Sequence, residues 1–492
     1  MGKTLSFVAA DLGAESGRVM VGRLDGDRLS ISEAHRFDSR PVRLPDGRHT
    51  DVLRIFGEIQ HGLGAAAAQG GEIASVGVDT WGVDLALLDA DGLLLGNPYH
   101  YRDAIGGTVM ERTFARVPRA EIFAATGVQL MEINTLFQLL RLQERGSAAL
   151  AAARHLVMVP DLFSFWLSGR VASEYTIATT SQCLDVARGR WATGLLERLS
   201  LPAAIFGEIV PPGTVLGDLL PHVAEEAGLP RRPVIAVGGH DTALAVAAVP
   251  AAGEGFAYLS SGTWSLLGAE IPRPCIGEAS RAANFTNEGG VGGTIRFLKN
   301  LCGLWLVQEC RRHWARQGEA DSYDRLTEMA AAASAFRSLL DVDDPAFAAP
   351  GDMPARIQAY CRQTGQPVPE TRGEIVRTAL DSLALKYRYV LAQMESILER
   401  RLEPLHVVGG GARNRLLCQL AADATGRAVV AGPVEATAAG NVLMQAVALG
   451  HLGSLAEARE VVRRSFEIAT FEPRPGPAVE DAYGRVVALV ER

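Results

Sequence analysis

The stretch from Val234 to Ala247 constrains the fold of this chain more than any other. It reads Val-Ile-Ala-Val, then Gly-Gly-His-Asp, then an alanine-rich apolar run. The short, β-branched first part is typical of a buried strand, and the apolar run is typical of a helix. Two glycines allow a sharp turn between them. The stretch therefore predicts an α/β protein with Asp241 at the mouth of a strand-to-helix turn, where open α/β sheets bind ligands. The alternative is that Asp241 only caps the helix, because Asp is a favoured N-cap residue.

Length and charge narrow the class of protein. A chain of 492 residues is too long for one ordinary core and predicts two large domains. The net charge of −8 argues against binding to nucleic acid or to an anionic membrane surface. No run approaches the ~20 apolar residues of a membrane span, and the N-terminal run from Leu5 to Ala10 is too short for a signal peptide. We therefore expect a cytoplasmic protein.

The cysteines agree with that compartment. The six cysteines include no Cys-x-x-Cys pair, and no cluster of Cys and His has the spacing of metal ligands. In so long a chain this pattern predicts reduced thiols in a cytosolic protein.

Two segments share a strand-turn-strand pattern. The first has a strand from Leu5 to Ala10, a loop of small residues from Asp11 to Arg18, and a second strand to Leu24. The segment from Gly255 to Gly268 repeats it around Ser-Ser-Gly-Thr. Backbone N–H groups in such loops can form an anion-binding nest, although a plain hairpin is the alternative. Two domains that each begin this way would face each other across a cleft.

Two more loops carry candidate binding residues. A strand from Ile73 to Val78 leads into Asp79-Thr-Trp-Gly-Val-Asp84, whose carboxylates and tryptophan suit sugar recognition; a turn with a packed Trp81 is the alternative. Between strands at 405–408 and 428–431, Gly409-Gly-Gly411 precedes a helix. This βαβ unit would let a flat ring or a phosphate lie against bare backbone, or it is a plain turn.

Three helices are expected from apolar spacing. They span 55–68, 296–310 and 374–401, and the last is expected to be the longest. The last has apolar residues at three- and four-residue steps, which predicts one buried face and no site.

Together these loops supply the parts that phosphoryl transfer needs. That chemistry asks for positioning and charge stabilisation by backbone N–H donors, a divalent ion, and a base near the acceptor hydroxyl. Two phosphate-sized loops, two carboxylates and a glycine turn occur here in the required order.

Over nearly its whole length the sequence resembles the FGGY carbohydrate kinases. The runs that carry the resemblance are Asp11-Leu-Gly-Ala-Glu-Ser-Gly-Arg18, Gly77-Val-Asp-Thr-Trp-Gly-Val-Asp84, Thr126-Gly-Val-Gln129, Ile133-Asn-Thr135, Gly239-His-Asp-Thr-Ala243, Leu259-Ser-Ser-Gly-Thr-Trp-Ser265, Asn284-Phe-Thr-Asn-Glu-Gly-Gly290, Arg296-Phe-Leu-Lys-Asn300, Gly303-Leu-Trp305, Val408-Gly-Gly-Gly411 and Gly432-Pro-Val-Glu-Ala436. The resemblance implies a two-domain, actin-like or ribonuclease-H-like ATPase fold with an interdomain cleft. It implies an N-terminal domain, 1–248, with the sugar side and first phosphate loop, and a C-terminal domain, 249–492, with the nucleotide side.

The resemblance also implies roles for individual residues. Asp241 is then the general base, and Asp11 lies at a magnesium ion. The sugar-binding residues it implies are Gly82, His240, Asp241, Thr242 and Asn300. The ATP-binding residues it implies are Ala14, Glu15, Ser16, Gly17, Arg18, Thr263, Gln308 and Gly410. Glu15 departs from the family pattern, which often has serine there. A carboxylate in a phosphate loop is unfavourable unless it points away or pairs with Arg18.

The activity implied is ATP-dependent phosphorylation of L-rhamnulose at its C1 hydroxyl, by a monomer or homodimer. The other members of the family leave L-fuculose, xylulose or glycerol as alternative acceptors. A non-catalytic actin-like ATPase is a further alternative from another class, although such a protein needs no sugar-side base such as Asp241.

Overall fold

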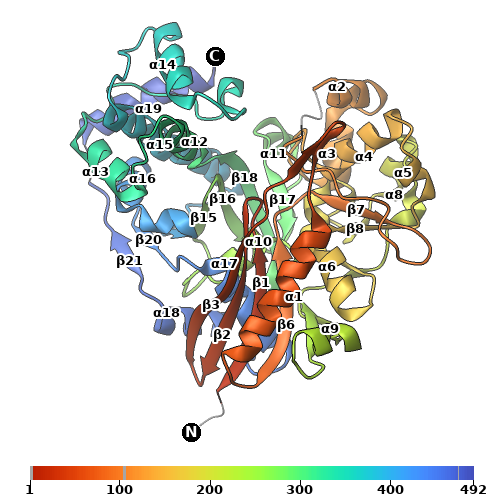
Figure 1. Ribbon diagram of the computed structural model, residues 1–492. Helices are drawn as coiled ribbons and strands as arrows, with labels where there is room; N and C mark the ends of the chain where they lie inside the picture. Colours follow the sequence, from red (N-terminus) through yellow and green to blue (C-terminus); the bar gives the residue numbers. More distant parts are fainter. Residues whose placement is uncertain (1–3, 104–106, 475) are drawn as a thin grey trace. The chain divides into compact units, whose positions relative to one another are not determined.

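Two sheets with matching strand order organise the structure (Figure 1). The computed structural model describes residues 4–103, 107–474 and 476–492. The first sheet has the order β13-β14-β6-β1-β2-β3, and the second has the order β17-β18-β16-β15-β19-β20-β21. The strands of the first sheet are β1 (Leu5–Leu12), β2 (Ser16–Asp25), β3 (Arg28–Asp38), β6 (Ile73–Thr80), β13 (Thr214–Asp218) and β14 (Pro233–Ala236). Those of the second are β15 (Ala257–Ser261), β16 (Trp264–Ile271), β17 (Thr286–Gly289), β18 (Ile295–Cys302), β19 (Leu405–Val408), β20 (Val429–Ala431) and β21 (Ala469–Phe471).

The repeat expected from sequence is confirmed by strand pairing. β1 pairs antiparallel with β2 and parallel with β6, and β6 pairs parallel with β14. In the second sheet β15 pairs antiparallel with β16 and parallel with β19, and β19 pairs parallel with β20. In each sheet one more strand pairs antiparallel with the last of these strands: β13 pairs with β14, and β21 pairs with β20. The two loops of small residues therefore occupy equivalent places, each between the first two strands of its sheet.

Packing divides the chain into two units. Unit 1 contains Met1–Ala248, Ile271–Phe297 and Ala436–Ser465, and unit 2 contains Val249–Glu270, Leu298–Glu435 and Phe466–Arg492. The chain thus divides after Ala248, but two later segments return to the first unit. One of them brings helix α17 (Ala436–Ala448) against β1, so blue and red segments lie side by side in Figure 1.

Glycines let two helices pack closely on the first sheet. A Cβ on Gly62 of α1 (Val52–Ala68) would lie 2.3 Å from a Val19 side-chain atom. A Cβ on Gly22 would lie 2.5 Å from Val442 of α17. Val19 and Gly22 lie on β2 three residues apart and therefore point to opposite faces. The sheet is covered by α1 on one face and by α17 on the other.

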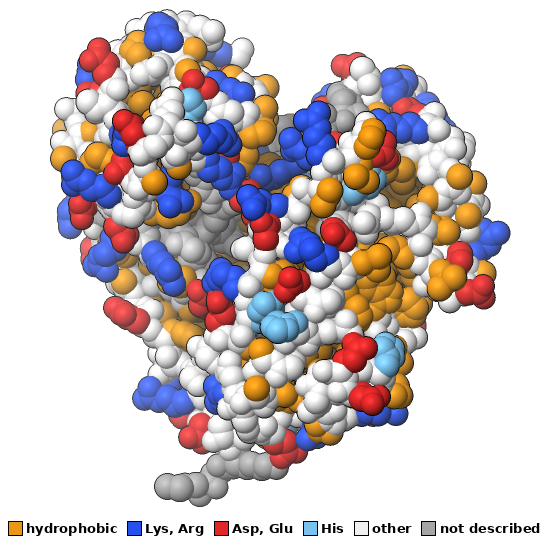
Figure 2. All heavy atoms as spheres, viewed as in Figure 1, with side chains coloured by type: hydrophobic (Ala, Val, Ile, Leu, Met, Phe, Trp, Pro, Cys, Tyr) orange, Lys and Arg blue, Asp and Glu red, His pale blue; other side chains and the backbone are white. Residues whose placement is uncertain are grey.

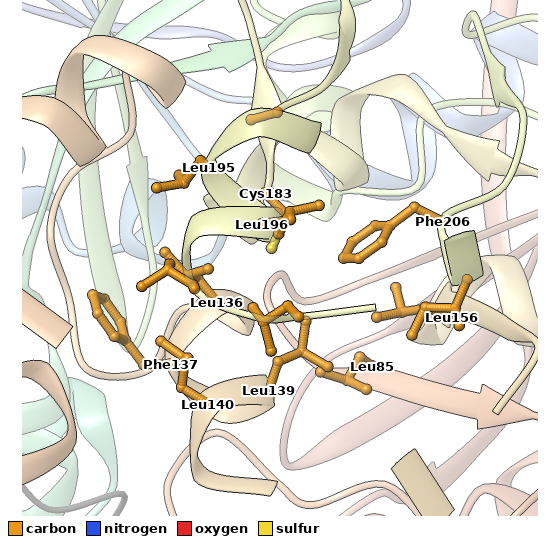
Figure 3. Close-up of a cluster of buried hydrophobic side chains, with 14 of the residues drawn as sticks. Leu85, Leu136, Phe137, Leu139, Leu140, Leu156, Cys183, Leu195, Leu196 and Phe206 are labelled. Atoms are coloured by element: carbon orange, nitrogen blue, oxygen red, sulfur yellow. The ribbon is translucent and has the colours of Figure 1, made fainter. Parts of the chain in front are cut away.

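A separate apolar cluster supports the helical part of unit 1 (Figure 3). Leu136, Phe137 and Leu140 of helix α4 (Thr135–Glu144) meet Leu85 of β7 (Leu85–Leu88) and Phe206 in this cluster. β7 pairs with β8 (His155–Met158), and α6 (Val159–Ser168) follows and is capped by Gly169 in the left-handed conformation. The cluster includes Leu85, which directly follows Asp84, so it supports the end of the Thr80–Asp84 loop.

Helix α15 is the longest in the described chain, as expected. It spans Arg372–Leu398 and begins with a capping box between Thr371 and Glu374. Its buried side chains include Leu380, Leu383 and Tyr387.

The helix expected over 296–310 is wrong. β18 runs to Cys302, and helix α12 (Trp305–Arg316) begins only after a turn at Gly303. The N–H groups of Gly303 and Trp305 donate to the carbonyl oxygen of Thr263, each at 3.2 Å. A Cβ on Gly303 would lie 2.5 Å from the carbonyl carbon of Trp264. This close approach of two backbones separates β18 from α12. The spacing of apolar residues cannot predict it, because it depends on a distant segment.

The remaining elements connect and cover the sheets. The short strands are β4 (Val42–Leu44), β5 (Gly47–His49), β9 (Ser173–Glu174), β10 (Leu184–Asp185), β11 (Arg190–Trp191) and β12 (Ile209–Val210). The other helices are α2 (Gly107–Arg116), α3 (Arg119–Thr126), α5 (Ala148–Ala152), α7 (Tyr175–Ala178), α8 (Thr193–Arg198), α9 (Pro221–Glu226), α10 (Asp241–Ala247), α11 (Glu278–Ala282), α13 (Tyr323–Ala332), α14 (Met353–Gln363), α16 (Arg415–Thr425), α18 (Leu455–Ser465) and α19 (Pro477–Val490). The short 3₁₀ helices are η1 (Thr179–Ser181), η2 (Ala203–Ile205), η3 (Val291–Gly293), η4 (Pro345–Phe347) and η5 (Gly410–Arg413).

Candidate active site

Asp241 lies at the first residue of α10, directly after the turn that follows β14. Gly238 has a φ of +138°, which a glycine adopts without strain. The N-cap residue of α10 is His240, so Asp241 is not the cap. Its Oδ1 accepts from the Thr242 N–H at 2.5 Å and from the Thr242 hydroxyl at 3.1 Å. The Asp241 side chain is 32% exposed, compared with 8% for His240. The carboxylate is therefore oriented locally and still accessible to a ligand.

A buried carboxylate holds the turn before Asp241 in place. Glu174, at the N-cap of α7, accepts from the Gly239 N–H at 2.7 Å and from the Ile177 N–H at 3.1 Å. The Thr176 hydroxyl donates to Glu174 at 2.5 Å and accepts from the His240 N–H at 3.3 Å. Burial raises the pKa of Glu174 above its usual value, and these hydrogen bonds offset only part of that rise. One side chain thus joins α7 to the Gly239-His240 turn.

We expect Glu174→Gln to destabilise this turn. One carboxylate oxygen becomes an NH₂ group that faces N–H or O–H donors, and an unsatisfied buried group costs about 1–3 kcal/mol. The kcat should fall by up to about 10²-fold, which a displacement of about 1 Å can cause. Thermal melting and steady-state kinetics measure both effects. The control is Glu208→Gln, because Glu208 is 63% exposed and its side chain pairs with Arg170 at the surface. Melting and kcat equal to those of the control would contradict the prediction.

His240 contacts a buried ion pair on its other side. The Nη2 of Arg296 lies 3.0 Å from His240 Nδ1 and 3.2 Å from Glu288 Oε2. Glu288 Oε2 lies 3.4 Å from the same Nδ1, and His240 Nε2 lies 3.4 Å from Asp241 Oδ1. Burial by itself raises the pKa of Glu288, but its contact with His240 and the charge of Arg296 outweigh burial and lower that pKa. Glu288 and Arg296 are therefore a charged pair next to the candidate base.

Strand register places two more carboxylates side by side. Asp11 on β1 lies opposite Arg18 on β2 and opposite Asp79 on β6. Arg18 donates to Asp11 Oδ2 at 2.6 Å, and Asn441 donates to Asp79 Oδ2 at 2.7 Å. Burial, followed by the charge of Asp11, raises the pKa of Asp79 well above its usual value, and the charge of Asp241 adds to this effect. Three carboxylates of unit 1 thus interact electrostatically at the ends of neighbouring strands.

The loop after β6 is held in a strained form. Thr80 donates its N–H to the Gly239 carbonyl oxygen at 2.9 Å, which places the loop beside His240. Val83 has a φ of 69°, unusual for a β-branched residue and typical of functional loops. Trp81 Nε1 donates to Asp84 at 2.8 Å, and burial raises the pKa of Asp84 to about 7. A Cβ on Gly82 would meet Thr180 at 3.3 Å. Trp81 is therefore packed, as one of the two interpretations of this loop expected, and sugar recognition by the loop stays a prediction.

The loop of small residues that is predicted to bind phosphate forms the turn between β1 and β2. Gly13 donates its N–H to the Ser16 carbonyl oxygen at 3.0 Å, which closes the turn. A Cβ on Gly17 would lie 2.4 Å from the Phe37 ring, so packing itself requires a glycine there. Glu15 pairs with Arg102 at 3.3 Å, and Arg18 pairs with Asp11 at 2.6 Å. The unusual carboxylate in this loop therefore has a cationic partner of its own.

Three residues predicted to bind ATP lie in unit 2. Thr263 occupies the turn between β15 and β16, and Gln308 lies one turn into α12. The Oε1 of Gln308 is buried and has no hydrogen-bond partner among the described residues. Gly410 begins η5 after Gly409, whose φ is +81°. A Cβ on Gly411 would lie 2.0 Å from Ser261 Oγ, whereas a Cβ on Gly410 would meet no atom within 4 Å. The glycine turn is thus packed on β15 at Gly411 and open at Gly410.

The structure groups some of the predicted site residues and separates others by unit. Asp11, Gly82, His240, Asp241 and Thr242 all lie in unit 1, near the end of β1, in the turns after β6 and β14, or in the first turn of α10. Asn300, predicted for the sugar, lies on β18 in unit 2. Glu174 and Asn441 were not expected from the sequence, and Glu288 and Arg296 stood out only as parts of family motifs. All four come from segments distant in the chain from Asp241.

Three general expectations can be compared with the structure. All six cysteines are free, and the four at 183, 310, 361 and 418 are buried. Within the described ranges, no helix has the length and apolar character to cross a bilayer. Over those same residues, no group of three or more His, Cys, Asp or Glu side chains could hold a metal ion. Lys and Arg are interspersed with Asp and Glu on the face shown in Figure 2.

Comparison with known proteins identifies the family. Residues 7–248 match the N-terminal domain and residues 257–449 the C-terminal domain of the FGGY family of carbohydrate kinases. The chain is 46% identical over 478 residues to the rhamnulokinase of Bacteroides thetaiotaomicron, covering 97% of this chain and 98% of the relative. It is 39% identical over 469 residues to the rhamnulokinase of Bacillus subtilis, covering 95% of each.

Solved structures share the fold at low sequence identity. The gluconate kinase of Lactobacillus acidophilus superposes with a TM-score of 0.80 at 15% identity, covering 99% of this chain and 97% of that one. The glycerol kinase of Plasmodium falciparum, solved with ADP, superposes with a TM-score of 0.78 at 14% identity, covering 100% and 98%. The two-domain α/β kinase fold expected from sequence is confirmed. The chain belongs to the FGGY family of carbohydrate kinases.

Proposed function

We propose that this protein transfers the γ-phosphoryl group of ATP to the C1 hydroxyl of L-rhamnulose, giving L-rhamnulose 1-phosphate and ADP. The observation that carries the proposal is the near-full-length similarity to proteins named rhamnulokinase. The geometry of the Gly239–Thr242 turn supports it, because phosphoryl transfer to an alcohol needs a base that the substrate can reach.

In this proposal Asp241 takes the proton from the C1 hydroxyl. Its side chain is accessible, and Thr242 already orients one of its oxygens. Gly82, His240 and Thr242 contact the sugar from unit 1, and Asn300 contacts it from unit 2. The buried supports of the turn keep the base in one orientation before the substrate arrives, which is how a site lowers the entropic part of a barrier.

ATP is assigned to five residues of the first loop and three residues of unit 2. The loop residues are Ala14, Glu15, Ser16, Gly17 and Arg18, and those of unit 2 are Thr263, Gln308 and Gly410. Two observations support the unit 2 assignment. The open space at Gly410 leaves bare backbone on which a ring can lie, and the buried Gln308 Oε1 lacks a donor that a nucleotide can supply. Residues 1–248 accordingly provide the sugar side and the first phosphate loop, and residues 249–492 the nucleotide side.

The cation that accompanies ATP is proposed to be Mg²⁺. The described residues fit this ion, because Asp11 offers a carboxylate and the buried Asp79 Oδ1 has no hydrogen-bond partner. Mg²⁺ is usually held by one or two carboxylates together with substrate phosphates and water, so a third protein ligand is not needed. When bound, the ion neutralises charge on the phosphate oxygens.

We also propose that the protein acts in the cytoplasm as a monomer or homodimer. The six free cysteines support the compartment, because thiols stay reduced there. The partners are then the sugar and ATP, without nucleic acid or membrane.

A panel of acceptors tests the substrate. A coupled ADP assay compares L-rhamnulose, L-fuculose, L-xylulose, D-xylulose and glycerol. We expect the highest kcat/KM with L-rhamnulose and only partial discrimination against L-fuculose, a stereoisomer. Glycerol lacks most of the hydroxyls, and a site built to hydrogen-bond them can reject such an analogue by about 10⁴–10⁵-fold.

The outcomes separate the alternatives. A higher kcat/KM with another acceptor would contradict the substrate but leave a sugar kinase. ADP release that no acceptor stimulates would favour a non-catalytic actin-like ATPase. Phosphorus–proton coupling in the NMR spectrum of the product identifies the phosphorylated carbon, which we expect to be C1.

A further inference from the structure

Arg296 is a completely buried arginine that contacts His240. Its exposed fraction is 0%, and it is among the largest fully buried side chains of the described chain. Its Nε donates to the Gly289 carbonyl oxygen at 2.9 Å, and its Nη2 reaches both His240 and Glu288. Burying an ion pair has a large desolvation cost, and apolar residues of similar volume are often equally stable. Stability alone therefore does not explain why an ion pair occupies this position.

The pair is also incompletely satisfied. Arg296 Nη1 and Glu288 Oε2 are buried without a hydrogen-bond partner among the described residues. Buried polar atoms normally find partners, so an exception indicates a constraint other than stability. Arg296 and Glu288 both contact His240, the residue that directly precedes the candidate base Asp241.

The contact between Arg296 and His240 determines which ring nitrogen carries the proton. A guanidinium group only donates hydrogen bonds. The contact of 3.0 Å with His240 Nδ1 is therefore favourable only if Nδ1 presents its lone pair. In the neutral ring the proton then belongs on Nε2. Nε2 lies 3.4 Å from Asp241 Oδ1, so the protonated ring nitrogen is the one next to the candidate base.

Glu288 favours the opposite arrangement, and the distances decide between them. A proton on Nδ1 could be donated to Glu288 Oε2, which lies 3.4 Å away. That arrangement would place two N–H groups against each other across the shorter contact between Nδ1 and Arg296, at 3.0 Å. Glu288 instead serves Arg296, to which it supplies a negative charge at 3.2 Å.

We propose that Arg296 is a positioning residue that holds His240 in the tautomer protonated on Nε2, the ring nitrogen that lies beside the carboxylate of Asp241. Glu288 and the Gly289 carbonyl oxygen orient Arg296 for this task. The consequence for catalysis rests on the proposed function, in which Asp241 is the base, but the tautomer itself does not.

The tautomer can be measured without any substrate. Protein labelled with ¹⁵N in histidine gives long-range ¹H–¹⁵N correlations that distinguish the two tautomers. The signals of His240 are those missing from the spectrum of His240→Gln. We expect the wild type to show the tautomer protonated on Nε2, and Arg296→Met to lose that preference. A wild-type proton on Nδ1, or an unchanged tautomer in Arg296→Met, would overturn the proposal.

Kinetics test the consequence with a matched control. Arg427 is also a buried arginine, 7% exposed, which pairs with Glu395 at 2.6 Å and whose Nε has no partner within the described part of the chain. We expect Arg296→Met to lower kcat by about 10²-fold, the typical effect of misplacing a catalytic group, with the KM for ATP within twofold of wild type. Arg427→Met should lower the melting temperature but leave kcat unchanged. Arg296→Lys, which keeps a donor, should recover part of the lost kcat.

The two proposals fail in different ways. An active wild type together with an unimpaired Arg296→Met would overturn the positioning role and leave the proposed function intact. Failure of the wild type to phosphorylate L-rhamnulose would overturn the proposed substrate, whereas the tautomer measurement would still decide the role of Arg296. If Arg296→Met does not fold, Arg296→Lys replaces it, with a weaker Nε2 preference expected and an unchanged one contradicting the proposal.

Discussion

Replacing Asp241 by asparagine is expected to lower kcat for L-rhamnulose by about 10²–10⁴-fold, the usual contribution of a general base. Asparagine keeps the shape of the side chain, and its Oδ1 can still accept from the Thr242 N–H and hydroxyl. The substitution removes only the ability to take a proton. The fold and the affinity for ATP should therefore persist.

Steady-state kinetics and calorimetry with a non-hydrolysable ATP analogue measure these two properties. Asp324→Asn is the matched control, because Asp324 also lies in the first turn of a helix, α13. Any loss of favourable interaction with the helix dipole then applies to both variants. An Asp241→Asn enzyme that keeps more than a tenth of the wild-type kcat would show that another group is the base.

Replacing Gly440 by alanine is expected to destabilise the packing of α17 on α10. A Cβ on Gly440 would lie 2.0 Å from the carbonyl oxygen of Leu244 and 2.6 Å from its carbonyl carbon. Both atoms are backbone, so neither can rotate aside and the helices must separate. Overpacking of this kind costs about 1–3 kcal/mol or more. Because α10 begins with Asp241, we expect kcat to fall as well.

Gly57→Ala provides the control for helix propensity. Gly57 lies within α1 and a Cβ there would meet no atom within 4 Å. Alanine at an open helical position is stabilising by roughly 0.5–1 kcal/mol. Thermal melting should therefore move in opposite directions, down for Gly440→Ala and up for Gly57→Ala. A Gly440→Ala protein that melts at or above the wild-type temperature would contradict the close packing of these helices.

Local sequence patterns predicted the elements that carry most of the candidate site. The β-branched run before Gly238 and the alanine-rich run after Asp241 became β14 and α10, and the apolar spacing over 374–401 belongs to the longest described helix. These predictions worked because each depends on neighbours within one or two turns of chain. The helix expected over 296–310 was wrong because Gly303 meets Trp264, about forty residues away in the chain, and no nearby residue records that contact.

The sequence by itself determined the α/β class, the repeated strand-turn-strand pattern and the position of Asp241 at a strand-to-helix turn. The spacing of apolar residues and the positions of glycines are local properties of the sequence, so they can be interpreted without knowledge of the tertiary structure. Only the tertiary structure decided which groups surround that turn. Glu174, Arg296 and Glu288 come from segments 47 to 67 residues from Asp241 in the chain, and Asn441 comes from one 200 residues away. Their contacts depend on how the sheet and helices pack. A buried polar or charged side chain is stabilised by partners from distant segments, and the residues next to it in the sequence do not indicate those partners.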